Sequence, residues 1–368
     1  MTKTKINRRT FLGTTAASAA VLASPAYLRK AHASGGEVNI WTYNQFVPNA
    51  FKEQFEKDTG IKVNVRLVDD QGKQFNLLAA EAPDPTVDIV TVAGHRFLQF
   101  IGSELLAPLD TGRLSNWSNI NPVFSESEWS NVNGEKWGAP ILSGMEVLAY
   151  NTDRVSRSDV ATWRDFFSDK YKGETAYTIQ DMMSIVMLMM GYDGNMVEYM
   201  EDPERAAEIV AEARNFLIEK KPLVRKYYDS GAEVQQMFVN QDIVMACAWN
   251  GPIAALMSDG FPVAMTIPEE GSYGFVYTYN IANNAPNPDN AYTFINAILA
   301  SPEIGAAMTK ASGFISTYKG ADAYLTPEEK AASSFPEDEL ARLQFFRAEA
   351  NEMKYSLVDP AVEAVKAA

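Results

Sequence analysis

The sequence predicts an α/β fold built from two similar lobes. Short apolar runs alternate with amphipathic stretches along most of the chain, which is typical of strands that alternate with helices. This order appears first over residues 37–68 and returns from residue 162 onward. About 335 residues remain once a short leader is set aside, and this length suggests two domains rather than one.

The first 33 residues have the pattern of an export signal. Paired Arg8 and Arg9 precede a short run rich in Ala, Ser and Thr, and Ala31-His32-Ala33 offers the small residues that a signal peptidase needs. An arginine pair in this place is typical of the twin-arginine route, which exports folded proteins. The apolar run is too short to anchor the chain in a membrane. We therefore expect cleavage near Ala33 and a soluble, exported protein.

Residues 37–68 form the first strand–helix–strand unit. An apolar strand over 38–43 leads through a loop into an amphipathic helix, Gly60 suits the helix C-terminus, and residues 61–67 alternate as a second strand. A right-handed crossover makes these strands parallel, so the first loop lies at the carboxyl edge of the sheet, where open α/β sheets bind ligands. This loop contains Tyr43, Asn44, Gln45 and Phe46.

Later segments extend the same pattern. A strand over 87–92 brings His95 and Arg96 to the same edge, and residues 141–151 read as a pair of strands after a hairpin. A Met-rich helix follows at 181–190, and the tail from residue 327 reads as helical and suited to the outside of a lobe. We assign 34–139 with about 270–315 to lobe 1, and 140–269 with about 316–368 to lobe 2.

Composition excludes several classes of function. Loss of residues 1–33 removes six basic side chains and no acidic ones, which takes the formal net charge from −15 to −21 and argues against nucleic acid as a partner. Cys247 is the only cysteine, so no disulfide forms, and His95 is the only histidine after the leader. We therefore expect no metal site, no cofactor and no catalytic residue.

Several blocks along the chain point to one family. The sequences WTYNQFVPNAFKEQFEKDTGIKV, VDIVTV, GAPILSGMEVLAYNTD, YKGETAYT, GYDGN, CAWNGPIAAL and IANNAPNPDNAYTFINAIL occur in this order. Together they resemble the periplasmic spermidine/putrescine-binding proteins of ABC importers. The resemblance implies two α/β lobes of the type II-like periplasmic-binding fold, joined by a multi-strand hinge. It also implies a monomer that closes over a small solute and passes it to a membrane permease without chemistry.

The resemblance also implies the residues of the ligand site. The aromatic walls of the family are kept, but several of its carboxylates fall on other residue types, with Asp181 one step from a matched position. The alternating Phe275 and Tyr277 could equally face the core of a lobe. The implied set is Tyr43, Asn44, Gln45, Phe46, His95, Arg96, Gln180, Asp181, Trp249, Phe275 and Tyr277.

Three cargoes or activities remain open at this point. A polyamine such as putrescine or spermidine follows from the resemblance. A zwitterionic or anionic molecule, such as a carboxylate, sulfonate or phosphonate, follows from Arg96, whose guanidinium would bind such a group in a bidentate manner. A periplasmic hydrolase is the remote alternative, because His95 is the only neutral-pH base.

Overall fold

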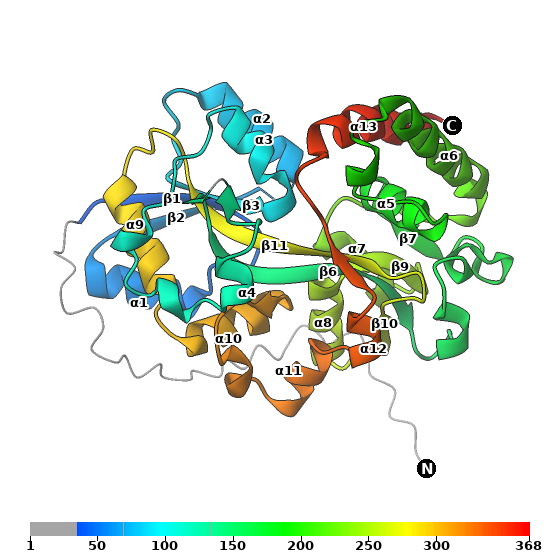
Figure 1. The fold of residues 1–368 in the computed structure, drawn as a ribbon. Helices are drawn as coiled ribbons and strands as arrows, with labels where there is room; N and C mark the ends of the chain where they lie inside the picture. Colours follow the sequence, from blue (N-terminus) through cyan, green and yellow to red (C-terminus); the bar gives the residue numbers. More distant parts are fainter. Residues whose placement is uncertain (1–34, 69, 133) are drawn as a thin grey trace, which may run out of the picture.

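The computed structural model describes residues 35–68, 70–132 and 134–368, and the predicted export signal lies outside them. One large mixed sheet runs through the molecule in the order β2-β1-β3-β11-β6-β9-β7-β8 (Figure 1). Helices cover both of its ends, which confirms the predicted α/β class. Among the described residues, no helix is both long and apolar enough to cross a membrane.

The strands of the large sheet belong to two groups that β6 and β11 connect. β10 and β12 also pair with β6, β13 pairs with β11, and β4 and β5 form a separate hairpin. The strands are β1 (Glu37–Thr42), β2 (Lys62–Leu67), β3 (Ile89–Ala93), β4 (Asn131–Val132), β5 (Glu135–Lys136), β6 (Ala139–Asn151), β7 (Thr175–Tyr177), β8 (Lys226–Tyr227), β9 (Met245–Trp249), β10 (Val263–Thr266), β11 (Ser272–Ile281), β12 (Ile315–Ser316) and β13 (Leu343–Phe345).

The helices surround each end of the sheet, and α13 packs on α6 and α5. They are α1 (Asn49–Thr59), α2 (Gln71–Glu81), α3 (Phe97–Gly102), α4 (Pro122–Ser125), α5 (Ile179–Met189), α6 (Pro203–Lys220), α7 (Gly231–Val239), α8 (Asn250–Ser258), α9 (Pro288–Ile298), α10 (Pro302–Ser312), α11 (Pro327–Ala332), α12 (Glu337–Leu340) and α13 (Asn351–Ala367).

The first unit forms as the sequence predicts. β1 and β2 are parallel partners, and Phe51 and Phe55 are the buried aromatic residues of α1. Gly60 ends this helix with a φ of 71°, and its N–H donates to the Glu56 carbonyl over 2.9 Å. Glycine adopts this left-handed conformation without the steric cost that a Cβ would bring. The loop after β1 therefore lies at the carboxyl edge of the sheet.

Two strands cross between the lobes. β6 and β11 are antiparallel partners, and both run the length of the junction in Figure 1. The predicted strand pair over 141–151 is wrong, because these residues continue the single strand β6. Gly144 lies inside this strand, and a Cβ there would lie 2.5 Å from the Phe275 ring, so close packing requires the glycine. The exact division of the chain between the lobes stays a prediction.

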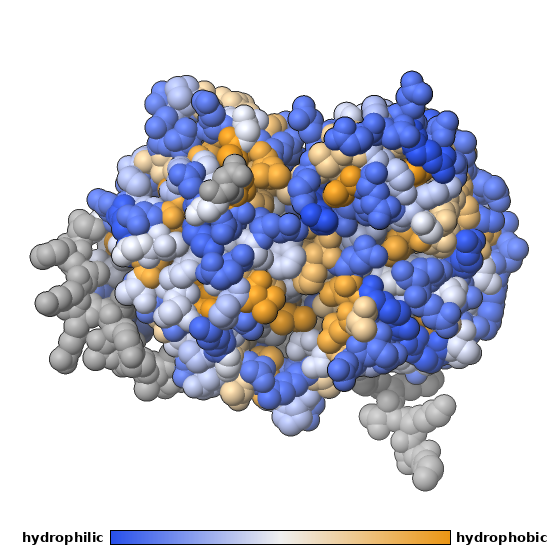
Figure 2. Space-filling view, in the orientation of Figure 1, coloured by the Kyte–Doolittle hydropathy of each residue, from blue (hydrophilic) through white to orange (hydrophobic). Residues whose placement is uncertain are grey.

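The tail also differs from its prediction. β13 pairs with β11, and α13 then lies over lobe 2 with its beginning next to lobe 1 (Figure 1). Phe346 follows β13, and its ring stacks on Tyr273 with centroids 4.7 Å apart. Burial of these rings holds the segment against the junction instead of the outside of a lobe. The face in Figure 2 is mainly hydrophilic, with hydrophobic groups gathered in patches, several of them near this junction.

Candidate functional site

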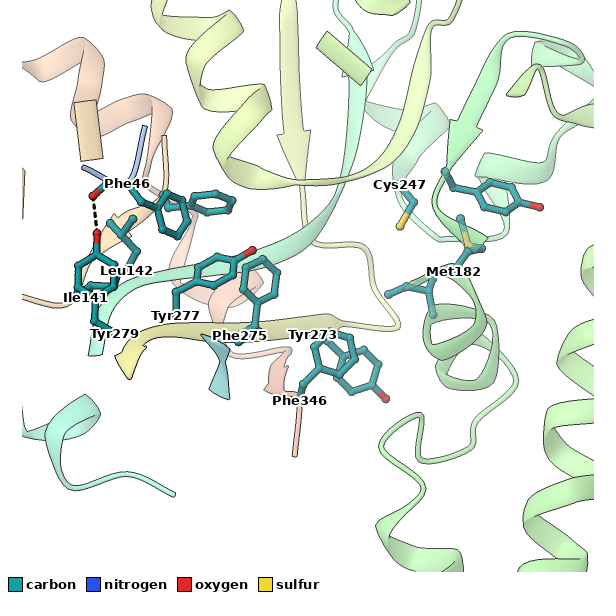
Figure 3. Close-up of a cluster of buried hydrophobic side chains, with 14 of the residues drawn as sticks. Phe46, Ile141, Leu142, Met182, Cys247, Tyr273, Phe275, Tyr277, Tyr279 and Phe346 are labelled. Atoms are coloured by element: carbon teal, nitrogen blue, oxygen red, sulfur yellow. Dashed lines mark hydrogen bonds between the residues drawn. The ribbon is translucent and has the colours of Figure 1, made fainter. Parts of the chain in front are cut away.

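The site begins at the loop after β1. Tyr43 is half-buried, and its hydroxyl accepts a hydrogen bond from Gln71 Nε2 over 2.6 Å. Phe46 is only 1% exposed, and its carbonyl accepts a hydrogen bond from the Tyr279 hydroxyl over 3.0 Å (Figure 3). The loop is thereby fixed at both of its aromatic residues. The two polar residues between them, Asn44 and Gln45, are exposed.

Aromatic rings continue this wall onto the crossing strand β11. The Tyr277 ring lies 5.0 Å from that of Tyr43 and 4.9 Å from that of Phe46, measured between centroids. Phe275 lies 5.2 Å from Tyr277, and both point to the same side of β11 in Figure 3. Phe314 closes the group at 5.5 Å from Tyr277. Such a wall offers flat π faces that attract a cationic or alkyl ligand.

A carboxylate that sequence reasoning missed faces this wall. Glu146 lies on β6, where it is the direct partner of Trp249 on β9, and only 1% of it is exposed. Its face of β6 also carries Gly144, which packs on Phe275. The Glu146 atom Oε2 is buried without a hydrogen-bond partner. Burial raises the pKa of this carboxyl well above 4.5, and the nearby Asp181 charge raises it further.

Asp181 supplies a second carboxylate from the first turn of α5. Thr178 caps this helix and donates to Asp181 Oδ2. Loss of solvation raises the pKa of Asp181, while hydrogen bonding to Thr178, the charge of Lys354 and a hydrogen bond from Trp249 lower it. The Trp249 indole also lowers the pKa of Glu146. Trp249 therefore lies beside both carboxyl groups.

Basic side chains lie where the two lobes meet. The Arg96 guanidinium stacks on the Tyr355 ring of α13, 4.3 Å from its centroid, and its Nη2 donates to Gln99 Oε1 over 3.0 Å. Lys354, on the same helix, is 4% exposed and lies 4.9 Å from the centroid of the Phe346 ring. Burial lowers the pKa of Lys354 to about 8. These cations thus hold the junction through aromatic contacts.

His95 also contacts the junction. Its ring lies 5.1 Å from that of Phe346, and its carbonyl accepts a hydrogen bond from the Asn351 side chain of α13. Burial lowers its pKa well below 6.5, and the charges of Arg96 and Lys354 act in the same direction. The imidazole is therefore neutral at neutral pH, and its Nδ1 has no partner.

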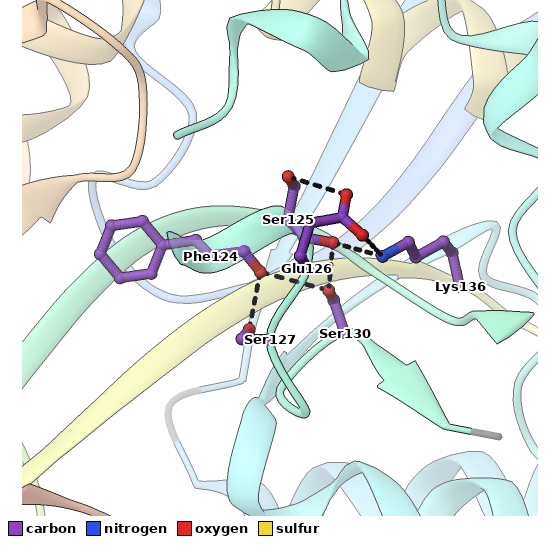
Figure 4. A network of polar contacts seen from close by, with 6 residues as sticks. All are labelled: Phe124, Ser125, Glu126, Ser127, Ser130 and Lys136. Atoms are coloured by element: carbon purple, nitrogen blue, oxygen red, sulfur yellow. Dashed lines mark hydrogen bonds and ion pairs between the residues drawn. The ribbon is translucent and has the colours of Figure 1, made fainter. Parts of the chain in front are cut away.

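A loop of lobe 1 also contacts the β13–α13 segment. Lys136 Nζ binds the Ser125 carbonyl over 2.5 Å and Glu126 Oε2 over 3.0 Å, and serine hydroxyls secure the turn around them (Figure 4). The loop so ordered brings Trp129 to within 4.4 Å of Phe345, measured between ring centroids. A Cβ on Gly94 would lie 2.7 Å from that of Trp129, so glycine permits the approach.

The structure brings together only part of the predicted set. Aromatic contacts join Tyr43, Phe46, Phe275 and Tyr277, and Asp181 lies next to Trp249, whose indole lowers the pKa of that carboxyl. Arg96 and His95 contact the β13–α13 segment, and Gln180 is half-buried at the start of α5. Within the described ranges, no cluster of His, Cys, Asp or Glu could hold a metal ion. The role of the eleven predicted site residues as ligand contacts stays a prediction.

Known proteins resemble this chain over most of its length. Residues 50–337 match the family model described as bacterial extracellular solute-binding protein. The spermidine/putrescine-binding periplasmic protein of Escherichia coli strain K12 is 24% identical over 78% of this chain and 80% of its own length. The spermidine/putrescine-binding periplasmic protein 1 of Haemophilus influenzae is 23% identical over 77% of this chain and 75% of its own.

Solved structures share the fold. A putative spermidine/putrescine ABC transporter protein from Listeria monocytogenes superimposes with a TM-score of 0.78 at 23% identity, over 90% of this chain and 98% of that one. Such a score over nearly the whole chain confirms the predicted two-lobed architecture. Because the family model spans both lobes and the crossing strands, the chain belongs to the bacterial extracellular solute-binding proteins.

Proposed function

We propose that this protein captures a polyamine, such as putrescine or spermidine, between its two lobes and delivers it to the permease of an ABC importer. The observation that carries the proposal is Asp181 beside Trp249 and the aromatic wall, because a carboxylate and π faces both stabilise a desolvated ammonium group. The relatives named for these polyamines support the same cargo.

The same relatives support a site of action outside the cytoplasm. Periplasmic proteins of this family act outside the cytoplasm, so the predicted signal over residues 1–33 would direct this chain there through the twin-arginine route. Cleavage near Ala33 would release a monomer of two lobes. Its strongly negative charge would favour encounter with cationic cargo and disfavour nucleic acid.

The alternative cargoes are less well supported. The Arg96 guanidinium is engaged by Tyr355 and Gln99, which favours a contact between lobes over an anchor for an anion. The hydrolase alternative would need His95 as a base, and this imidazole packs on Phe346 instead of next to a nucleophile. We therefore propose binding without catalysis.

Thermal unfolding of the purified protein tests the cargo. A ligand at a hundred times its Kd stabilises the folded state by about 2.7 kcal/mol, which raises the Tm of a chain of this size by about 4 °C. We expect putrescine or spermidine to give this shift, and small carboxylates, sulfonates, phosphonates and amino acids to give none. A shift with an acid or zwitterion alone would overturn the polyamine cargo, and the variant Asp181→Asn should lose the response to amines.

A further inference from the structure

The strongest unexplained feature of the molecule is the carboxyl group of Glu146. It is the only charged residue of β6, a strand whose thirteen residues are all buried. It is 1% exposed, its Oε2 has no hydrogen-bond partner, and no ion pair within 4.0 Å involves it in the described part of the chain. A carboxylate in such surroundings is costly unless a cation joins it.

A comparison with another buried carboxylate shows how unusual this is. Glu339 is 5% exposed, but Arg157 Nη2 donates to its Oε1 over 2.7 Å. The Thr266 hydroxyl and the Ile267 N–H donate to its Oε2 over 3.0 Å and 2.8 Å. The chain thus satisfies a buried glutamate where its role is structural. It leaves Oε2 of Glu146 buried without a hydrogen-bond partner.

We propose that Glu146 binds one ammonium group of the cargo together with Asp181, and that Glu146 releases its proton to the solvent when this ammonium arrives. The inference rests on the proposed function and names the anchor of the same site. Glu146 lies on the strand that joins the lobes, and Asp181 reaches it from α5. Trp249 is the strand partner of Glu146, and its indole lowers the pKa of both carboxyl groups, so it lies next to both.

The groups around Glu146 agree with an exchange of cation for proton. The titratable groups facing it are Asp181 on α5, Cys247 on β9, Tyr228 after β8 and Tyr277 on β11. All four are neutral or acidic. Lys354 on α13 is a base whose charge acts on the neighbouring Asp181. Burial and the Asp181 charge both raise the pKa of Glu146, whereas an ammonium group beside it would favour the charged carboxylate and so promote release of the proton.

Calorimetric titration of the purified protein with putrescine and spermidine tests the proposal. Binding measured in phosphate and in Tris, which differ in ionisation enthalpy, gives the number of protons released. We expect close to one proton from Glu146, with an affinity that rises up to tenfold per pH unit over the range in which this proton is released. Since this measurement uses the wild-type protein, it does not depend on the folding of any variant.

The variant Glu146→Gln should release close to one proton fewer and bind about 10- to 100-fold more weakly, because an uncharged amide replaces a charged partner. Glu339→Gln is the matched control: it should lower the Tm, since Arg157 loses its partner, while affinity and proton release stay unchanged. Equal affinity and equal proton release in Glu146→Gln and wild type would overturn the inference and leave the proposed function intact. No binding of any amine by the wild-type protein would overturn both.

Discussion

Replacement of Glu146 by glutamine should change how the stability of the ligand-free protein depends on pH. The folded-state pKa of Glu146 is raised above its ordinary value of 4.5, so its favourable contribution is complete below pH 4.5 and is lost as the pH rises through the folded-state value. Between pH 4.5 and the folded-state pKa, the unfolded chain has released this proton and the folded chain has kept it. The free energy of unfolding therefore falls by about 1.4 kcal/mol per pH unit. Glutamine does not titrate and removes this dependence.

The size of the effect is measurable as a difference in Tm. About 335 residues that each contribute about 2.1 cal/mol/K give an unfolding entropy of about 0.7 kcal/mol/K, so 1.4 kcal/mol corresponds to about 2 °C. Scanning calorimetry at half-unit steps upward from pH 4.5 should show the Tm of Glu146→Gln rising relative to wild type by about 2 °C per pH unit until the folded-state pKa of Glu146 is passed. Groups that do not interact with Glu146, such as His95, contribute equally in both proteins, so the difference reports Glu146 together with its coupled neighbour Asp181. A constant difference in Tm across this range would mean that Glu146 is already ionised when the protein is folded, which refutes the reasoning.

Three further substitutions or reactions test other parts of the structure. Gly144→Ala places a Cβ 2.5 Å from the Phe275 ring. Urea unfolding should show that the free energy of unfolding falls by about 1–3 kcal/mol, and amine binding should become weaker. An unchanged urea midpoint would contradict the close packing. Asn351→Ala removes the hydrogen bond to the His95 carbonyl, and X-ray scattering should report a larger radius of gyration without amine but not with saturating amine. Cys247 is 1% exposed and burial raises its pKa well above 9.0, so Ellman's reagent should label it only after unfolding; rapid labelling of the native protein would show that β9 is accessible.

Local elements were predictable because their signals are local. The helix with Phe51 and Phe55 on one face, and the glycine that ends it, depend on neighbours within a few residues. The long strand β6 was not predictable in this way. A glycine inside a strand can be explained only once the rings of Phe275 and Phe314 are known to fill the space beside Gly144. Contacts between residues more than a hundred positions apart leave no periodic pattern in the sequence.

The aromatic residues of the candidate site could be predicted from the sequence, but the buried carboxylate Glu146 was not. Tyr43, Phe46 and Tyr277 were named from loop position and family resemblance, and the structure joins their rings. Glu146 was missed because the resemblance places carboxylates elsewhere. Its signal was present, since a single charged residue within the apolar run of 139–150 requires a partner or a function. The role of the tail was missed because Phe345 and Phe346 pack on Trp129 and Tyr273, which lie far away in the sequence.

The position of the carboxylates suggests how cargo and closure are coupled. The Arg96 guanidinium on Tyr355 joins lobe 1 to α13, and the charge of Lys354 on the same helix acts on Asp181. A ligand shifts an equilibrium between open and closed lobes only through contacts that differ between the two forms. In the proposed site, Asp181 is the group that lies next to both the cargo and a basic side chain of the junction. Under this proposal the carboxylates provide affinity for the ammonium group, and the interaction of Asp181 with Lys354 relates the cargo to the contact between the lobes.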